Sequence, residues 1–139
     1  MTHTIIQPDG WPPARGYANG VLASNGTLHI GGQIGWNAAM TFESDDFVSQ
    51  TEQALANIRT VLEAAGGTVT DLVRLTWYVT DKKEYLARQR ELGEAYRRVL
   101  GRHFPAMTLV EVNALVEDRA RVEIEATAVL TARGQSSDG

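Results

Sequence analysis

Two segments near the C-terminal end of the chain alternate between apolar and polar residues, as half-buried β-strands do. In residues 104–112, Glu111 separates Val110 from Val112, and we place these valines on the aliphatic face. In residues 121–128 the two kinds of residue oppose each other, with Val122, Ile124, Ala126 and Ala128 on one face and Arg121, Glu123, Glu125 and Thr127 on the other. The carboxylates must be solvated, paired or placed at a boundary between chains.

The same alternation predicts further strands earlier in the chain. Residues 16–23 and 27–34 are expected to form a hairpin, because the intervening Asn25-Gly26 accommodates positive φ at little cost. Residues 71–80 are expected to form another strand. The predicted apolar faces contain Leu28, Ile30, Gly32 and Ile34 in one strand and Val73, Leu75, Trp77 and Val79 in the other. Residues 1–14, with several prolines, are expected to be an irregular lead-in.

Helical spacing separates these strands. The apolar stripe of the first helix comprises Val48, Thr51, Leu55, Ile58 and Leu62. Ser44 or Asp45 is the expected N-cap, and Gly66-Gly67 ends this helix. Asp81 and Glu84 have capping-box spacing, which predicts one second helix that ends at Gly101.

The predicted order is β-β-α-β-α-β-β, an α+β fold in which two helices cover one face of a single mixed sheet. The other face is polar or mixed, and we assign to it Thr27, His29, Gln33, Arg74, Thr76, Tyr78, Met107, Leu109, Glu111, Glu123 and Glu125. A face that holds Tyr, Leu and Met among charges favours an oligomer packed through it.

Composition narrows the function classes. A chain of 139 residues is sufficient for one domain, which we assign to residues 1–133, with 134–139 as a disordered tail. The net charge of −4 disfavours nucleic acid and anionic membrane surfaces as partners. Without cysteine, a disulfide or thiolate nucleophile is excluded. No apolar run could span a membrane and no secretory signal is visible, so we expect a cytoplasmic protein. The histidines lack metal-ligand spacing and no Gly-x-Gly-x-x-Gly motif occurs, so no metal or cofactor is expected.

Motifs along almost the whole chain carry a family resemblance. Pro105-Ala106-x-Thr108-x-Val110-Glu111-Val112 and Val122-Glu123-Ile124-Glu125-Ala126 resemble the signature of the RidA/YjgF family. Further matches are Arg15-Gly16-Tyr17-Ala18, Ile30-Gly31-Gly32-Gln33-Ile34, Gln50-Thr51-x-Gln53-Ala54-Leu55-x-Asn57-Ile58, Val61-Leu62-x-Ala64-Ala65-Gly66 and Thr76-x-Tyr78-Val79-Thr80-Asp81. Members are small trimeric enamine/imine deaminases, once named L-PSP endoribonucleases. The resemblance implies a chorismate-mutase-like fold and a homotrimer whose sheets enclose a barrel, with a ligand cleft at each subunit boundary.

The resemblance also implies two catalytic residues. Glu123 matches the glutamate beside the water that hydrolyses the imine, and a carboxylate becomes a usable base when it is partly desolvated or lies near another carboxylate. Its alternative role is an interfacial salt bridge to arginine. Tyr17 matches the site tyrosine that holds substrate or water, and its alternative is a half-buried strand tyrosine.

Departures from the family pattern concern the binding of the ligand. Met107 replaces the arginine that binds the substrate carboxylate, which a thioether cannot do. Gly31, beside Gly32 in the Gly-Gly-Gln-Ile motif, replaces a serine, and Leu109 replaces a small polar residue. Arg90 lies near the site asparagine of the family and could bind an acidic ligand across the cleft; its alternative is a solvated helix residue.

Two functions follow as hypotheses. The first is hydrolysis of an enamine or imine that is less acidic, or larger and more apolar, than 2-aminoacrylate. The second is a trimer that binds or senses a small ligand without chemistry. RNA cleavage is disfavoured by the acidic charge.

Overall fold

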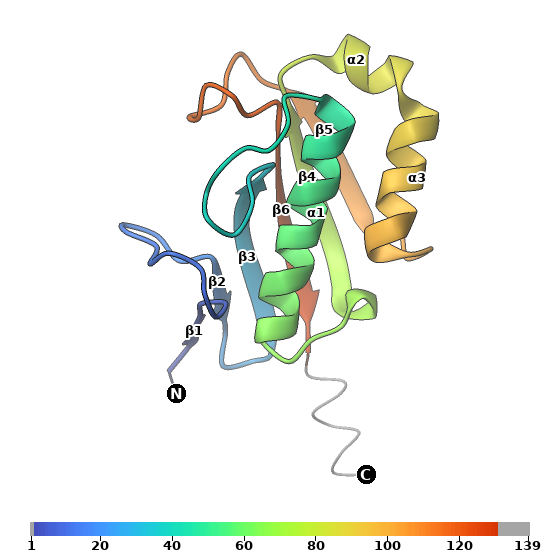
Figure 1. Cartoon of the computed structure of the whole chain (residues 1–139). Helices are drawn as coiled ribbons and strands as arrows, with labels where there is room; N and C mark the ends of the chain where they lie inside the picture. Colours follow the sequence, from blue (N-terminus) through green and yellow to red (C-terminus); the bar gives the residue numbers. More distant parts are fainter. Residues whose placement is uncertain (1, 131–139) are drawn as a thin grey trace.

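Residues 2–130, which the computed structural model describes, form a six-stranded mixed sheet in the order β1-β2-β3-β6-β4-β5 (Figure 1). The strands are β1 (Thr4–Ile6), β2 (Gly20–Leu22), β3 (Thr27–Ile34), β4 (Leu72–Val79), β5 (Ala106–Glu111) and β6 (Val122–Val129). β4 and β5 pair in parallel, and the other neighbours are antiparallel. The predicted tail 134–139 lies outside the described residues.

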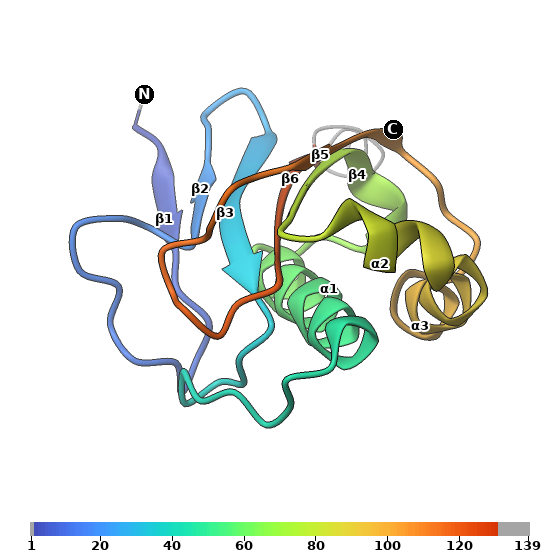
Figure 2. The same ribbon diagram turned by 90° about the horizontal axis from the view of Figure 1, so that it is seen from above.

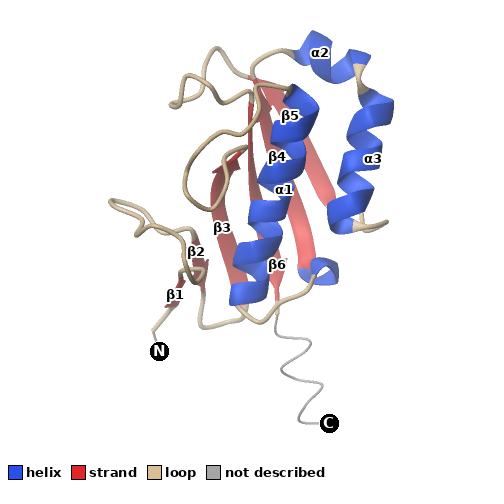
Figure 3. Ribbon diagram, in the orientation of Figure 1, coloured by secondary structure: helices blue, strands red, loops and turns tan. Residues whose placement is uncertain are grey.

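The helices α1 (Phe47–Ala64), α2 (Lys82–Ala87) and α3 (Gln89–Leu100) lie on one side of the sheet, as Figures 2 and 3 show. A short 3-10 helix, η1 (Val69–Asp71), precedes β4. This arrangement confirms the predicted α+β fold with one sheet covered on one face. None of the helices in residues 2–130 has both the length and the apolar character needed to cross a membrane.

The predicted aliphatic stripes form the core between these layers. The whole stripe of α1 is buried, and so are the four aliphatic residues of β6. Leu55, Ile58 and Leu62 are fully enclosed. Burial of each such side chain stabilises the fold by roughly 1.5–3 kcal/mol, and α1 packs against β3, β6 and α3.

The ends of the helices agree with the sequence only in part. Asp81 caps α2 as predicted, since its carboxylate accepts hydrogen bonds from the amides of Lys83 and Glu84. Asp46, rather than Ser44 or Asp45, caps α1 by accepting from the Ser49 amide at 2.9 Å.

Two further elements differ from the prediction. The single second helix is wrong, because Arg88 leaves helical geometry between α2 and α3. The irregular lead-in is wrong at residues 4–6, where β1 pairs with β2 and buries Ile6. Three residues between polar and proline-rich neighbours are too few for an alternation pattern to reveal a strand.

Irregular pairing changes which side chains point toward the helices. The pairing of β3 with β6 shifts between Ile30 and Gln33, so Gln33 is only 4% exposed and Ile34 lies opposite Glu123. The assignments of Gln33 to the polar face and of Gly32 and Ile34 to the apolar face are therefore wrong. A similar shift in β4 buries Leu72 and leaves Val73 46% exposed. A bulge adds one residue, and each side chain beyond it changes face.

The predicted orientation of β5 is also wrong. Met107 and Leu109 pair with Leu75 and Trp77, which places them, and Glu111 after them, on the helix-covered side. Val110 is instead on the side away from the helices, which we call the open face. Described members of this face include His29, Thr76, Tyr78, Thr108, Val110, Glu123, Glu125 and Thr127. Since β5 has apolar residues on both faces, alternation alone could not orient it.

Candidate functional site

A cavity of about 430 Å³ lies near the C-terminal end of β3. Its walls come from β3, from the loops before β2, after β3 and before β6, and from single residues of α1 and β6. These loops are the blue, teal and orange segments that surround the end of β3 in Figures 1 and 2. The cavity is thus built from segments far apart in the sequence.

Four predicted site residues line this cavity: Tyr17, Gly31, Gly32 and Glu123. The structure therefore brings together both predicted catalytic residues and the Gly-Gly motif, although their roles remain predictions. Met107, Leu109 and Arg90 are not part of this lining within one chain. The first two belong to β5 at the far edge of the sheet, and Arg90 is exposed on α3.

The Glu123 side chain lies directly against the backbone of Gly32. A Cβ atom at residue 32 would overlap the Glu123 carboxylate. Because β3 bulges at Gly31 and Gly32, its backbone lies directly beneath this carboxylate. Gly32 therefore has a geometric reason that involves the proposed catalytic group itself, whereas a Cβ at Gly31 would lie 3.2 Å from the Ala18 carbonyl oxygen.

The carboxyl of Glu123 is half-buried on the open face, and its surroundings favour the protonated form. Burial raises its pKa above the ordinary glutamate value, and the nearby Glu125 carboxylate raises it further. The Tyr78 hydroxyl donates to Glu125 Oε1 at 2.7 Å, and this bond raises the pKa of the phenol. A carboxylate with a raised pKa is a stronger base when ionised, which suits it to take a proton from water.

Buried amide side chains hold the cavity wall in place. Gln33 Nε2 donates to Asn19 Oδ1 and to the Gly31 carbonyl, each at 3.2 Å, which links the bulge to the loop before β2. Asn57 Nδ2 donates to the carbonyls of Ile34 and Trp36, at 3.1 and 2.8 Å. Sequence reasoning gave Asn57 no role, although a polar residue between the buried Leu55 and Ile58 was a usable signal.

Aromatic side chains form much of the remaining wall, including Trp11, Tyr17 and Trp36. Trp36 lies 5.8 Å from Phe42, measured between ring centroids. The loop after β3 is organised by Asn37 Oδ1, which accepts from the amides of Ala39 and Thr41. Trp36 is therefore placed by a hydrogen-bonded loop, while Trp11 and Tyr17 come from the loop before β2.

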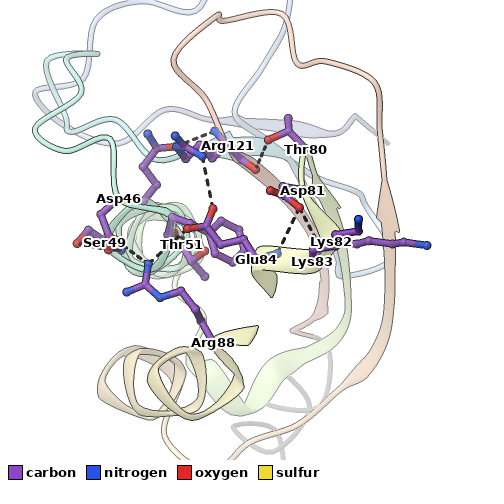
Figure 4. Close-up of polar contacts among 12 residues, drawn as sticks. Asp46, Ser49, Thr51, Thr80, Asp81, Lys82, Lys83, Glu84, Arg88 and Arg121 are labelled. Carbon is purple, nitrogen blue, oxygen red and sulfur yellow. Dashed lines mark hydrogen bonds and ion pairs between the residues drawn. The ribbon is translucent and has the colours of Figure 1, made fainter. Parts of the chain in front are cut away.

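Ion pairs tie the helices together outside the cavity. Arg88, at the break between α2 and α3, bonds to Asp46 at 2.7 Å and Glu91 at 2.6 Å. Figure 4 shows Glu84 between Arg88 and Arg121, which it approaches at 3.6 and 3.4 Å. The Arg88 guanidinium lowers the pKa of the Asp46 carboxyl. These arginines are thus already paired with carboxylates.

Comparison with known proteins identifies the family. Residues 9–130 match the family model described as endoribonuclease L-PSP. The chain belongs to this family, the RidA/YjgF family. The match covers every residue that lines the cavity.

Relatives in this family include named deaminases. A 2-iminobutanoate/2-iminopropanoate deaminase of Escherichia coli is 35% identical over 130 residues, which cover 93% of this chain and 98% of the relative. A RutC family protein of Haemophilus influenzae shows the same identity and coverage. The crystal structure of a putative endoribonuclease L-PSP from Entamoeba histolytica matches with a TM-score of 0.82 at 27% identity, covering 93% of this chain and 100% of that one.

Proposed function

We propose that this protein hydrolyses reactive imines and enamines, with Glu123 as general base and Tyr17 as the group that orients the substrate. The observation that carries the proposal is the half-buried Glu123 carboxylate above Gly32, in a cavity that also contains Tyr17. The similarity to a named imine deaminase supports the same reaction type.

The reaction needs one water molecule and one group that accepts and returns a proton. Glu123 takes a proton from water while the oxygen forms a bond to the imine carbon, and the C=N electron pair moves to nitrogen. The same carboxyl then returns the proton to the nitrogen of the carbinolamine. The C–N bond breaks as the oxygen forms a C=O bond and its remaining proton passes through the same carboxylate to the leaving nitrogen, and a carbonyl compound and ammonia leave. A base of this kind typically contributes a rate factor of about 10²–10⁴.

A second part of the proposal concerns the oligomer. In the protomer β5 is an edge strand, and Met107 and Val110 on it are 43% and 41% exposed. Exposed apolar residues on an unpaired edge favour contact with another chain. We propose that β5 of a neighbouring copy closes the cavity in a cytoplasmic homotrimer. Met107 and Leu109, with Arg90 nearby, would then contact the small-molecule ligand.

The alternative is a trimer that binds a small ligand without converting it. Met107 and Gly31 favour it, because they replace the arginine and serine with which family members hold a substrate. In that case the cavity would keep its shape while the polar contacts that anchor a small imino acid are absent.

Hydrolysis of imines generated in place distinguishes these functions. An amino-acid oxidase supplies 2-iminopropanoate, 2-iminobutanoate and bulkier imines, and the loss of semicarbazone signal measures hydrolysis. We expect faster decay with the wild type, a loss of about 10²-fold or more in Glu123→Gln, and no change in Glu63→Gln, an exposed control at the end of α1. Wild-type protein that accelerates no imine would support the binding function, and a fully active Glu123→Gln would refute the mechanism.

A further inference from the structure

The charged side chains that line the cavity are both acidic. Among the described residues of its wall, Glu117 and Glu123 carry carboxylates, and no lysine, arginine or histidine takes part. The neighbouring Arg119 pairs with Asp45 at 2.9 Å and lies over the Phe42 ring at 5.3 Å. Arg15 is exposed and outside the wall. A substrate carboxylate placed here would meet like charge without a compensating cation.

The remaining wall suits a ligand that combines a cationic group with an apolar side chain. Trp11, Tyr17 and Trp36 supply aromatic rings, and Met40 and Val116 supply further apolar surface. Aromatic faces attract cations, and they do so more strongly where water is partly excluded. A volume of about 430 Å³ is within the range of small-molecule sites and could hold a phenyl-sized group.

The chemistry of an imine links these two properties. A protonated imine carries one positive charge and is more electrophilic at carbon than its neutral form. Its cationic nitrogen would face the carboxylates while its side chain contacts the aromatic wall. The hydrolysis balances as RCH=NH₂⁺ + H₂O → RCHO + NH₄⁺, with Glu123 carrying the two protons of the water, one after the other, to the nitrogen.

We propose that the cavity prefers imines without a carboxylate to 2-imino acids. The preferred substrates are the iminium ions formed by oxidation of primary amines that carry an aromatic or long apolar side chain. This specificity rests on the proposed imine hydrolysis. The class of reaction that supplies such a substrate is the two-electron oxidation of a primary amine, and the product is an aldehyde. Glu117 is the carboxylate that we assign to recognition of the cation.

A matched pair of substrates tests this selection with the full chain. Oxidation of 2-phenylethylamine and of phenylalanine produces imines that share the benzyl group and differ by one carboxylate. We expect kcat/KM to be at least about 10-fold higher for the imine without it, a ratio equal to 1.4 kcal/mol. Equal or higher activity on the imine of phenylalanine would overturn the selection but leave the hydrolysis intact.

Binding of inert probes tests the selection without any turnover. We expect calorimetry to show at least about 10-fold tighter binding of 2-phenylethylammonium than of 3-phenylpropanoate. Glu117→Gln should remove most of this preference and leave the affinity for neutral 2-phenylethanol unchanged. Asp118→Asn, on the same loop but outside the cavity wall, is the matched control. Tighter binding of the carboxylate probe, or an unchanged preference in Glu117→Gln, would contradict the proposal even if imines are hydrolysed.

Discussion

The cavity beside β3 and the β5 edge both contain predicted site residues, but the protomer supports them differently. Glu123 lies over a glycine bulge, next to a wall held by buried amides from α1 and the loop before β2. Met107 lies on an exposed edge strand whose other side has no partner among residues 2–130. Within one chain, therefore, only the Glu123 region has a supporting wall, whereas Met107 would reach the ligand only in the proposed oligomer, where β5 of a neighbouring copy closes the cavity.

We expect the largest loss of activity from a substitution at Gly32. In Gly32→Ala the new Cβ would displace the Glu123 carboxylate, and a misplacement of about 1 Å can reduce the rate about 10²-fold. Steady-state kinetics with 2-iminopropanoate and the preferred imine would measure this loss. Gly93→Ala, on α3 and outside the cavity wall, where a Cβ would meet only the end of the Arg97 side chain, controls for general effects of adding a methyl group. An active Gly32→Ala variant would show that Glu123 is not held in one position.

We expect the next largest effect from removal of the Asn57 amide, which holds the cavity wall. Asn57→Ala removes the donor to two carbonyls of the cavity wall. A buried group left without its hydrogen bond typically costs about 1–3 kcal/mol, so we expect a lower free energy of unfolding in urea and reduced activity. Gln53→Ala, which removes the residue that donates to Asn57 Oδ1 from a less buried position, should have a smaller effect. Equal effects would argue against Asn57 as the main support.

Met107→Arg tests whether the β5 edge contributes to ligand binding. If β5 of a neighbour closes the cavity, a guanidinium at this position could bind a carboxylate through two hydrogen bonds. We expect the kcat/KM ratio of carboxylated to carboxylate-free imine to rise about 10-fold, with little change in stability because residue 107 is exposed. Met107→Lys is a control for charge alone. An unchanged ratio in a folded oligomer would indicate that β5 does not reach the ligand.

The pH dependence should report the electrostatics of the Glu123 region. The ionised base is active, so the acid limb of kcat/KM should lie above the ordinary carboxyl pKa. Glu125→Gln removes one cause of the raised pKa, and the limb should move to lower pH. Between the ordinary and the raised pKa the folded state binds more protons than the unfolded state, so stability falls as pH rises through this window. A limb that moves upward in Glu125→Gln would reverse the assigned sign.

Arg90→Ala should have the smallest effect. Arg90 is exposed and outside the described cavity wall, and the proposed substrate has no carboxylate for it to bind. We expect unchanged kcat/KM for the carboxylate-free imine, measured beside Arg97→Ala, another arginine on α3. A clear loss would show that Arg90 contacts the ligand from a neighbouring copy.

The sequence by itself determined the order of most elements, the apolar stripes of α1 and β6 and the Asp81 cap. These features depend on spacing along one segment, and helical or strand periodicity places their side chains without reference to the rest of the chain. The family resemblance also pointed to Glu123 and Tyr17, which both line one cavity.

Tertiary structure decided the features that depend on pairing between distant segments. The bulge at Gly31 and Gly32 reverses the faces of Gln33 and Ile34 through the register with β6. The orientation of β5 follows from its parallel pairing with β4, and the role of Asn57 follows from carbonyls more than twenty residues earlier. Alternation predicts that the two faces of a strand differ. The face that packs against the helices is decided by the register with the partner strand, because this register sets which side chains become buried.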